Sequence, residues 1–213
     1  MGPIERRQRE REEIRTRILD AARELFVAEG YEAVTMRRIA DRIEYSPTAI
    51  YFHFKDKDAL MGELCAVDFY TLATQLTKIA RVEDPIERLR RIGKAYAGFA
   101  AEFPNHYRLM FMTPHPVGTL PEDAMQRHGN PEEDAYAFLK ATVAEAIAQN
   151  RLKPEHDDAE LVSQTMWAGV HGVVSLHIAK ECDPWVEWRS IKTRVSTMID
   201  ILVDGLSKQK RSK

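Results

Sequence analysis

The segment from Ser46 to His53 combines groups that can contact anions with residues small enough for another molecule to approach the backbone closely. Ser46 and Pro47 begin a predicted short helix, because serine caps free backbone N–H groups and proline at the first helical position loses no needed donor. A helix N-terminus at Ser46 also directs N–H groups at an anion. The side chains that follow are small at first and then aromatic or imidazole groups: Thr48, Ala49, Tyr51, Phe52 and His53. This order favours contacts with base edges near the helix start and with phosphates further along.

Two short predicted helices, at about 36–43 and 47–53, position these side chains. The first begins after Thr35, which can direct its own helix N-terminus at an anion, and it carries Arg37. Its apolar residues share one face, at Met36, Ile39, Ala40 and Ile43. Each helix is too short to be stable alone. Two such helices joined by a tight turn form a helix-turn-helix, whose second helix enters the major groove of DNA.

Helical periodicity continues through nearly the whole chain and predicts an all-α fold. One helix runs from Ile14 to a stop at Gly30, because glycine adopts the left-handed conformation readily. Later helices are expected to begin at Asp56, Asp84-Pro85, Pro104, Asn130-Pro131 and Asp157, and the last one bears Ile191 to Leu206. Residues 113–131 are rich in proline and are expected to be irregular, as a lid over a pocket or a surface loop.

Residues 14–64 resemble the DNA-binding region of the TetR family of bacterial transcription regulators. The motifs that carry the resemblance lie at residues 18–26, 29–31, 35–40 and 51–60. The resemblance implies phosphate contacts by Thr35, Tyr51, Phe52, His53 and Lys57. It implies that Arg37, Pro47, Thr48 and Ala49 lie near base edges.

The sequence departs from the family pattern at the turn between the two helices. Glu44 stands where the family usually has glycine, so either Glu44 adopts an unusual backbone angle or the turn differs. Pro47 and Phe52 each remove a polar contact that the family commonly has. Phe54 is interpreted as a core residue. The mixed run of Arg and Glu before Ile14 is expected to be an exposed helical extension, with a minor-groove arm as the alternative.

The second half resembles one subgroup of TetR-type C-terminal domains, through residues 93–111 and the Trp167…His171-Gly172 helix. The resemblance implies a small-molecule effector and a homodimer. The predicted ligand-binding residues are aromatic or apolar with a few polar tips, as in pockets for apolar ligands: Tyr96, Phe99, Phe103, Tyr107, Phe111, Trp167, Val170 and His171. The alternative is that these residues form only a helical core.

The last two helices are expected to form the dimer interface as a four-helix arrangement. One apolar stripe comprises Ile191, Val195, Met198, Leu202 and Leu206, and a second apolar face comprises Val162, Met166, Gly169, Val170, Val173 and Val174. The predicted organisation is a DNA-binding domain at 1–57, with a charged extension at 1–12, then a ligand-binding and dimerisation domain at 58–207 and a basic tail at 208–213.

Composition limits the possible classes of function. The chain has 213 residues, 44% of them apolar, with 31 Lys+Arg and 33 Asp+Glu. Since residues 1–57 carry 12 Lys+Arg and 11 Asp+Glu, the DNA-binding prediction depends on the local motif and not on bulk charge. The longest apolar run is too short for a membrane span, no signal peptide is expected, and two cysteines give no disulfide framework, so a cytoplasmic protein is predicted.

The predicted function is a repressor that a small apolar or aromatic ligand releases from a palindromic operator. The alternatives are an activator, a co-repressed regulator, an architectural DNA binder, and a helical carrier or enzyme. We find no nucleophile motif and no phosphate loop, and we predict no catalytic residue, cofactor or metal. A metal site formed by His106, His115, His128 and His156 is a minor alternative.

Overall fold

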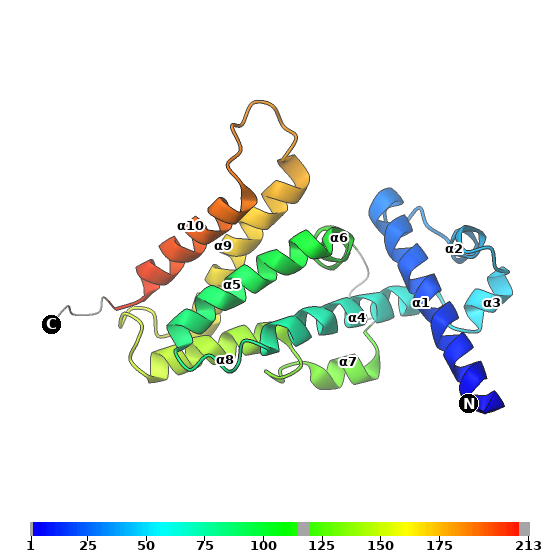
Figure 1. Cartoon of the computed structure of the whole chain (residues 1–213), viewed down its shortest axis with the longest axis horizontal. Coiled ribbons are helices and arrows are strands. Elements are labelled where there is room, and N and C mark those ends of the chain that lie inside the picture. The colour runs from blue at the N-terminus through cyan, green and yellow to red at the C-terminus, as the bar shows by residue number, and fades with distance from the viewer. Residues whose placement is uncertain (1, 115–119, 209–213) are drawn as a thin grey trace. The chain divides into compact units, whose positions relative to one another are not determined.

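A computed structural model describes residues 2–114 and 120–208, and it confirms that the described chain is built from helices (Figure 1). In chain order these are α1 Pro3–Glu29, α2 Met36–Arg42, α3 Pro47–Tyr51, α4 Lys57–Thr77, α5 Pro85–Glu102, α6 Pro104–Met112, α7 Glu122–Arg127, α8 Ala135–Ala148, α9 Ala159–Lys180 and α10 Ile191–Leu206. Among these residues the one extended pairing is an isolated bridge between Leu152 and Ser207. No helix of the described residues is long and apolar enough to cross a bilayer.

The chain divides into two compact units, and α4 contributes residues to both. The first unit contains Met1–Asp68 and Asn105–Gln126, and the second contains Phe69–Pro104 and Arg127–Lys213. The predicted boundary after residue 57 therefore falls at the start of α4, whereas the first unit continues along this helix to Asp68. Of the predicted basic tail, only Lys208 lies within the described residues.

The core of the first unit forms where α1 to α4 and α6 bring their apolar faces together. Ile18 and Phe26 of α1, Ile39 of α2, Ile50 of α3 and Leu109 of α6 are fully buried in one cluster. Because α2 and α3 are too short to persist alone, this shared core is what holds them helical. The helix-turn-helix expected from the sequence is thus confirmed, although α3 ends at Tyr51 and not at residue 53.

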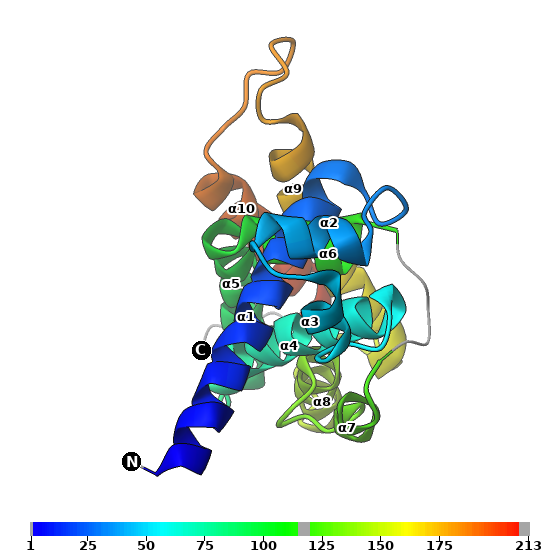
Figure 2. The same ribbon diagram turned by 90° about the vertical axis from the view of Figure 1, so that its right-hand side faces the viewer.

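The first helix is longer than its buried part requires. It begins at Pro3, so the mixed Arg and Glu run is helical, as predicted for an exposed extension. Figures 1 and 2 both show the N-terminal end of α1 continuing past α3. The helix ends at Gly30, as predicted, but with φ of 83° and ψ of 158° rather than in the left-handed helical conformation expected there; this backbone region is essentially restricted to glycine.

The second unit is a bundle in which α5 and α9 contact each other and each also contacts α8 and α10. Gly93 of α5 and Gly169 of α9 allow α10 to approach closely. A Cβ atom at Gly93 would lie 2.9 Å from the Cγ1 atom of Ile199, and one at Gly169 would lie 2.7 Å from a methyl group of Leu202. Arg90 of α5 forms ion pairs with Asp200 and Asp204 of α10.

Several predicted helix starts are wrong by one or more residues. The helix expected at Asn130-Pro131 begins at Ala135, because Asp134 accepts hydrogen bonds from the backbone N–H groups of Tyr136 and Ala137. The cap expected at Asp157 is Asp158, whose carboxylate accepts from Glu160 and Leu161. The stretch 113–131 is less irregular than predicted, since α7 lies within it, and its residues 115–119 lie outside the described part.

The apolar faces of α9 and α10 point mainly into their own unit. Val195 and Leu206, which the sequence analysis assigned to the dimer stripe, are buried within the bundle. Val162, Met166, Val170 and Val174 of α9 are buried there too. The large apolar side chains left exposed on these helices are Leu161, Trp167, Leu176 and Ile201. Periodicity identified apolar faces correctly but could not say which neighbour covers each one.

Candidate nucleic-acid interface

The second helix of the helix-turn-helix is fixed at its start by a side-chain cap and in its middle by the core. The Ser46 hydroxyl accepts a hydrogen bond from the backbone N–H of Ala49 at 3.3 Å, and Pro47 takes the first helical position. Ile50 is fully buried and holds the helix against its neighbours. Thr48 and Tyr51 are left exposed on the opposite side, so α3 presents a defined outward face.

The turn before α3 explains how a glutamate replaces the family's usual glycine. Glu44 has φ of 61°, which lies in the left-handed region that side chains with a Cβ atom rarely adopt. The backbone N–H of Tyr45 then donates to the carbonyl of Ala40 at 3.0 Å. Of the two alternatives at Glu44, the structure therefore has the unusual backbone angle.

The predicted DNA-contacting residues on α2 and α3 are accessible. Thr35 caps α2, since its hydroxyl accepts from the N–H of Arg38 at 3.2 Å. Arg37 is exposed, and its guanidinium forms no hydrogen bond or ion pair within the described chain. Tyr51 and Phe52 are 54% and 71% exposed, so both aromatic side chains are largely open to solvent. Pro47 and Ala49 are half-buried.

His53 and Lys57 are less accessible than the resemblance implies. The Lys57 ammonium group donates to the carbonyl of Tyr31 at 2.8 Å and lies 4.1 Å from the centre of the Tyr31 ring. The His53 ring is half-buried, and its Nδ1 atom has no hydrogen-bond partner within the described residues. Burial lowers the pKa of His53, and the nearby Arg11 and Arg15 lower it further, so this imidazole is held neutral. Phe54 is buried, as predicted.

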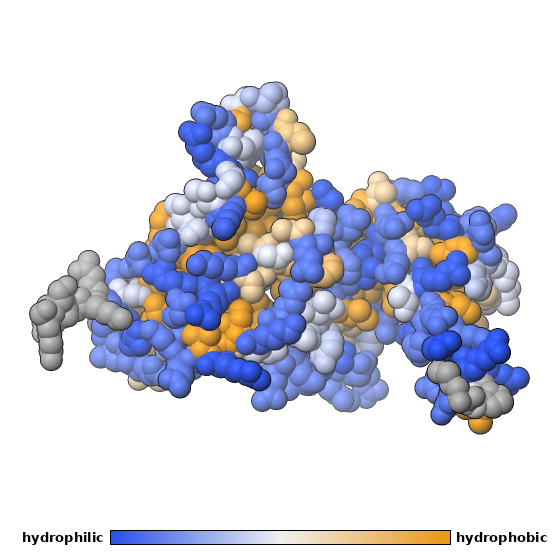
Figure 3. All heavy atoms as spheres, in the orientation of Figure 1, coloured by the Kyte–Doolittle hydropathy of each residue, from blue (hydrophilic) through white to orange (hydrophobic). Residues whose placement is uncertain are grey.

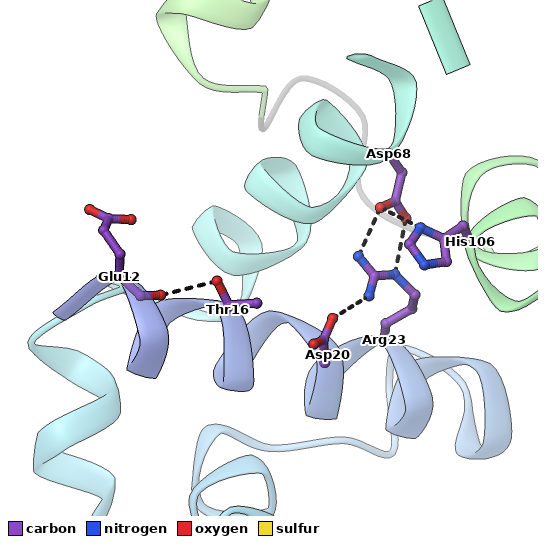
Figure 4. Close-up of polar contacts among 6 residues, drawn as sticks. All are labelled: Glu12, Thr16, Asp20, Arg23, Asp68 and His106. Carbon is purple, nitrogen blue, oxygen red and sulfur yellow. Dashed lines mark hydrogen bonds and ion pairs between the residues drawn. The ribbon is translucent and has the colours of Figure 1, made fainter. Parts of the chain in front are cut away.

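A buried ion-pair cluster that was not predicted from the sequence joins α1, α4 and α6 (Figure 4). The Asp68 carboxylate of α4 accepts hydrogen bonds from the Nε and Nη2 atoms of Arg23 of α1, at 3.2 and 2.8 Å. It also lies 2.9 Å from Nδ1 of His106 of α6. Asp20 bonds to the same guanidinium at 2.8 Å. Asp68 and Arg23 are 0% and 6% exposed, so three helices share one buried charge cluster.

The Arg23 guanidinium is kept charged by its partners. Burial by itself would lower its pKa, but the hydrogen bonds and charges of Asp68 and Asp20 outweigh this and raise it. An available sequence signal was the position of Arg23 on the apolar face of α1, between Leu19 and Phe26. A charge on a buried face implies a buried partner, but the pattern does not say which residue supplies it.

In the second unit the structure brings together three of the predicted ligand-binding residues. The Tyr96 hydroxyl accepts from the indole N–H of Trp167 at 3.1 Å and lies 3.1 Å from Nδ1 of His171. The rings of Trp167 and His171 are 6.2 Å apart, which fits their spacing of one helical turn. Burial lowers the pKa of His171, which favours the neutral imidazole.

Other predicted lining residues are distributed between the two units. Phe99 and Phe103 of the second unit have ring centres 5.4 Å apart. Tyr107 and Phe111 belong to the first unit, with ring centres 4.9 Å apart and Tyr107 fully buried. Val170 is buried in the bundle.

Tyr136 was not predicted from the sequence. Its ring centre lies 6.0 Å from that of Trp167, and its hydroxyl donates a hydrogen bond to Glu160. The second unit also has an open depression of about 390 Å³, lined by Thr74, Thr77, Lys78 and Arg81 and by none of the predicted ligand-binding residues. Among the described residues, no three His, Cys, Asp or Glu side chains gather where they could hold a metal ion. His115, from the minor metal alternative, lies outside the described part of the chain.

Comparison with known proteins gives matches for both halves of the chain. Residues 18–64 match the family described as bacterial regulatory proteins, tetR family. Residues 89–201, just over half of the chain, match the tetracyclin repressor-like C-terminal domain. Neither match depends on the geometry described above.

Individual relatives agree with these matches over part of the chain or at low identity. The HTH-type transcriptional regulator UidR of Escherichia coli (strain K12) is 38% identical over 80 residues, so the chain spans 38% of the length of this relative. The nucleoid occlusion factor SlmA of Edwardsiella ictaluri is 28% identical over 173 residues, which cover 78% of this chain and 84% of SlmA. The crystal structure of the transcriptional regulator PfmR of Thermus thermophilus has a TM-score of 0.69 at 21% identity, covering 90% of this chain and 99% of PfmR. This last likeness concerns the fold.

Proposed function

The chain belongs to the TetR family of bacterial transcription regulators, and on this premise we propose that it is a repressor released from an inverted-repeat operator by a small apolar or aromatic ligand. Its family consists of DNA-binding regulators and not of enzymes. The observation that carries the proposal is the outward face of α3. This helix is capped, anchored by buried Ile50, and exposes Thr48 and Tyr51.

We assign direct contacts with DNA to the residues that this geometry leaves accessible. Thr48, with Pro47 and Ala49, lies at the start of α3, where a helix in the major groove approaches base edges. Arg37 is expected near the bases as well, since its guanidinium can pair with guanine. Tyr51, Phe52 and Thr35 are expected to lie against phosphates. Lys57 and His53 support the surface through Tyr31 and the turn after α3, and Lys57 can reach a phosphate only by leaving the Tyr31 carbonyl.

A homodimer is proposed because two helix-turn-helix units read paired half-sites. The exposed apolar side chains of α9 and α10, at Leu161, Leu176 and Ile201, supply a surface for it. Figure 3 shows apolar surface around α9 and α10. Replacing Ile201, which is 64% exposed, with arginine places a charge on this surface without disturbing the buried core. We expect Ile201→Arg to be monomeric in analytical ultracentrifugation, whereas the matched variant Lys192→Ala, also exposed on α10, stays dimeric.

The proposed effector site is built around Tyr96, Trp167 and His171. Trp167 is 39% exposed, so its indole is accessible to a ligand while its N–H is already bound to Tyr96. Apolar pockets with a few polar groups that set orientation are typical of small-molecule sites. The ligand must bind the DNA-free state more tightly than the DNA-bound state, because equal affinities would shift no population. An activator or a co-repressed regulator would use the same DNA-contacting surface and effector site, but the effect of the ligand on DNA binding or on transcription would be reversed.

The proposal is tested by fluorescence anisotropy with duplexes of about 30 base pairs, tiled across the DNA upstream of the gene and its neighbour. Binding confined to one tile, weakened by Tyr51→Ala and falling steeply with salt, supports the assignment. A set of apolar and aromatic compounds is then screened for release of that tile. The effector site is supported if a compound releases the wild-type protein from that duplex but does not release the Trp167→Ala variant. Equal binding to every tile would instead indicate an architectural DNA binder.

A further inference from the structure

We propose that the N-terminal extension of α1 forms a second DNA contact, in which Arg7 and Arg11 bind phosphates that flank the half-site read by α3. This inference rests on the proposed function only in that DNA is the partner. It assigns part of the binding to residues outside the helix-turn-helix, on a segment whose sequence is nearly neutral.

The spacing of the arginines places them on one side of α1. Arg7, Arg11 and Arg15 follow one another at intervals of four residues, and the same face continues into buried Ile18 and Ala22. This is the face that packs on the core of the first unit. Where α1 leaves that core, its inward face changes from apolar residues to arginines, so the arginines lie on the side that carries α2 and α3.

The contacts of Arg15 and Arg11 tie this stripe to the end of α3. The Arg15 guanidinium lies 4.4 Å from the ring centre of Phe54 and donates to the carbonyl of His53 at 3.2 Å. The Arg11 guanidinium lies 5.3 Å from the ring centre of Phe52. Since Phe52 directly follows α3 and is highly exposed, the stripe begins beside the proposed DNA-contacting surface.

The rise of the helix shows how far the stripe extends that surface. At about 1.5 Å per residue, Arg11 lies about 6 Å beyond Arg15 along the axis, and Arg7 lies about 12 Å beyond it. Guanidinium groups at these positions would meet the backbone of DNA outside the base pairs that α3 reaches. Figures 1 and 2 both show the extension continuing past α3.

Charge pairing separates Arg7 and Arg11 from the other arginines near them on α1, since Arg15 at the inner end of the stripe is paired with Glu63 of α4 at 3.0 Å. Away from the stripe, Arg6 pairs with Glu10 at 2.9 Å and Arg9 pairs with Glu13 at 3.3 Å. The Glu5 carboxylate accepts from the backbone N–H of Gly2. Within the described residues, neither Arg7 nor Arg11 forms a side-chain hydrogen bond or an ion pair.

Two carboxylates lie beside the stripe. Glu10 is three residues after Arg7 and is paired with Arg6, and Glu12 lies about 100° around the helix from Arg11. The extension is therefore neutral when counted by sequence but positive on one face. Figure 3 shows the surface at this end of α1 as hydrophilic.

The test compares two double variants with the same change of net charge. Arg7→Gln/Arg11→Gln removes the stripe, and Arg6→Gln/Arg9→Gln removes two arginines from the other side of the same helix. Binding of each to the tile selected by the wild-type protein is measured by anisotropy across a range of salt. Each lost phosphate contact reduces the magnitude of the slope of log K against log salt by about 0.9. The magnitude of this slope should therefore be smaller by about 1.8 for the stripe variant than for the wild-type protein. At about 0.1 M salt its affinity should fall on the order of tenfold or more.

The control variant should keep both the wild-type slope and affinity to within about threefold. Shortening the duplex at its outer ends should abolish the difference between the two variants, because the stripe then has no phosphates to meet. Equal slopes for the two variants, while wild-type protein still selects one tile, would overturn this proposal and leave the proposed function standing. Failure of the wild-type protein to bind any tile would overturn both.

Discussion

Removing one member of the buried Arg23–Asp68 pair should destabilise the protein far more than removing an exposed ion pair. The two side chains are 7% and 0% exposed, so each charge has little water to replace its partner. Breaking such a pair from one side typically costs about 3–5 kcal/mol, against about 0–1 kcal/mol for an exposed pair. The loss of stability in Asp68→Leu should lie at the upper end of this range for buried pairs, because the variant leaves the Arg23 guanidinium with only the exposed Asp20 as a partner. Arg23→Met should cost less, since Asp68 keeps His106 at 2.9 Å.

The assay is urea unfolding followed by circular dichroism, for both single variants and the double variant Arg23→Met/Asp68→Leu. We expect the double variant to recover most of the lost free energy of unfolding, because it leaves no uncompensated buried charge. Asp68→Asn keeps the volume and one acceptor oxygen, and it serves as the measurable variant if Asp68→Leu does not fold. The exposed pair Arg42–Glu24 provides the matched control. Single variants within about 1 kcal/mol of wild type, or a double variant equal to the sum of the singles, would refute the reasoning.

Three further predictions concern single positions. Burial raises the pKa of Cys65 to about 12, so at about pH 8 a thiol reagent should label exposed Cys182 at once and Cys65 only on unfolding; rapid labelling of both would contradict this. The pKa of His53 should be below that of an ordinary histidine in an NMR titration, and it should rise in Arg11→Gln. Because the lowered pKa favours the neutral ring, the contribution of His53 to the free energy of unfolding is present above the unfolded-state pKa and is lost as the pH falls through the folded-state pKa. Glu44→Gly should raise the free energy of unfolding by about 0.5–1 kcal/mol, since glycine adopts φ of 61° without strain, and a loss of stability in thermal melts would count against the turn geometry.

Local signals in the sequence were sufficient for the helix-turn-helix and for most of the other helices, although α7 was not predicted. Ser46-Pro47 and Asp84-Pro85 begin helices where predicted, because a cap and a first-position proline act within a few residues of the chain. Asn130-Pro131 failed for the same local reason, since Asp134 is a better cap further along the chain. At Glu44, where the related family usually has glycine, the sequence left two possibilities, an unusual backbone angle or a different turn, and the structure has the first.

Interactions between distant residues could not be predicted in the same way. Arg23 and Asp68 are 45 positions apart, and no periodicity connects them. Val195 and Leu206 belong to an apolar face of α10, but whether a helix of the same chain or a partner covers that face depends on the packing of the whole bundle. The proximity of Trp167 and His171 could be predicted because both residues lie on one helix, one turn apart.

The central claim is that a dimer reads two half-sites through α3, and hydroxyl-radical footprinting on the selected tile tests it most directly. The account predicts two protected patches related by an inverted repeat, with centres about 10 base pairs apart or a multiple of that spacing. Tyr51→Ala should remove both patches together. A single patch, protection spread evenly along the duplex, or a footprint unchanged in Tyr51→Ala would contradict the account.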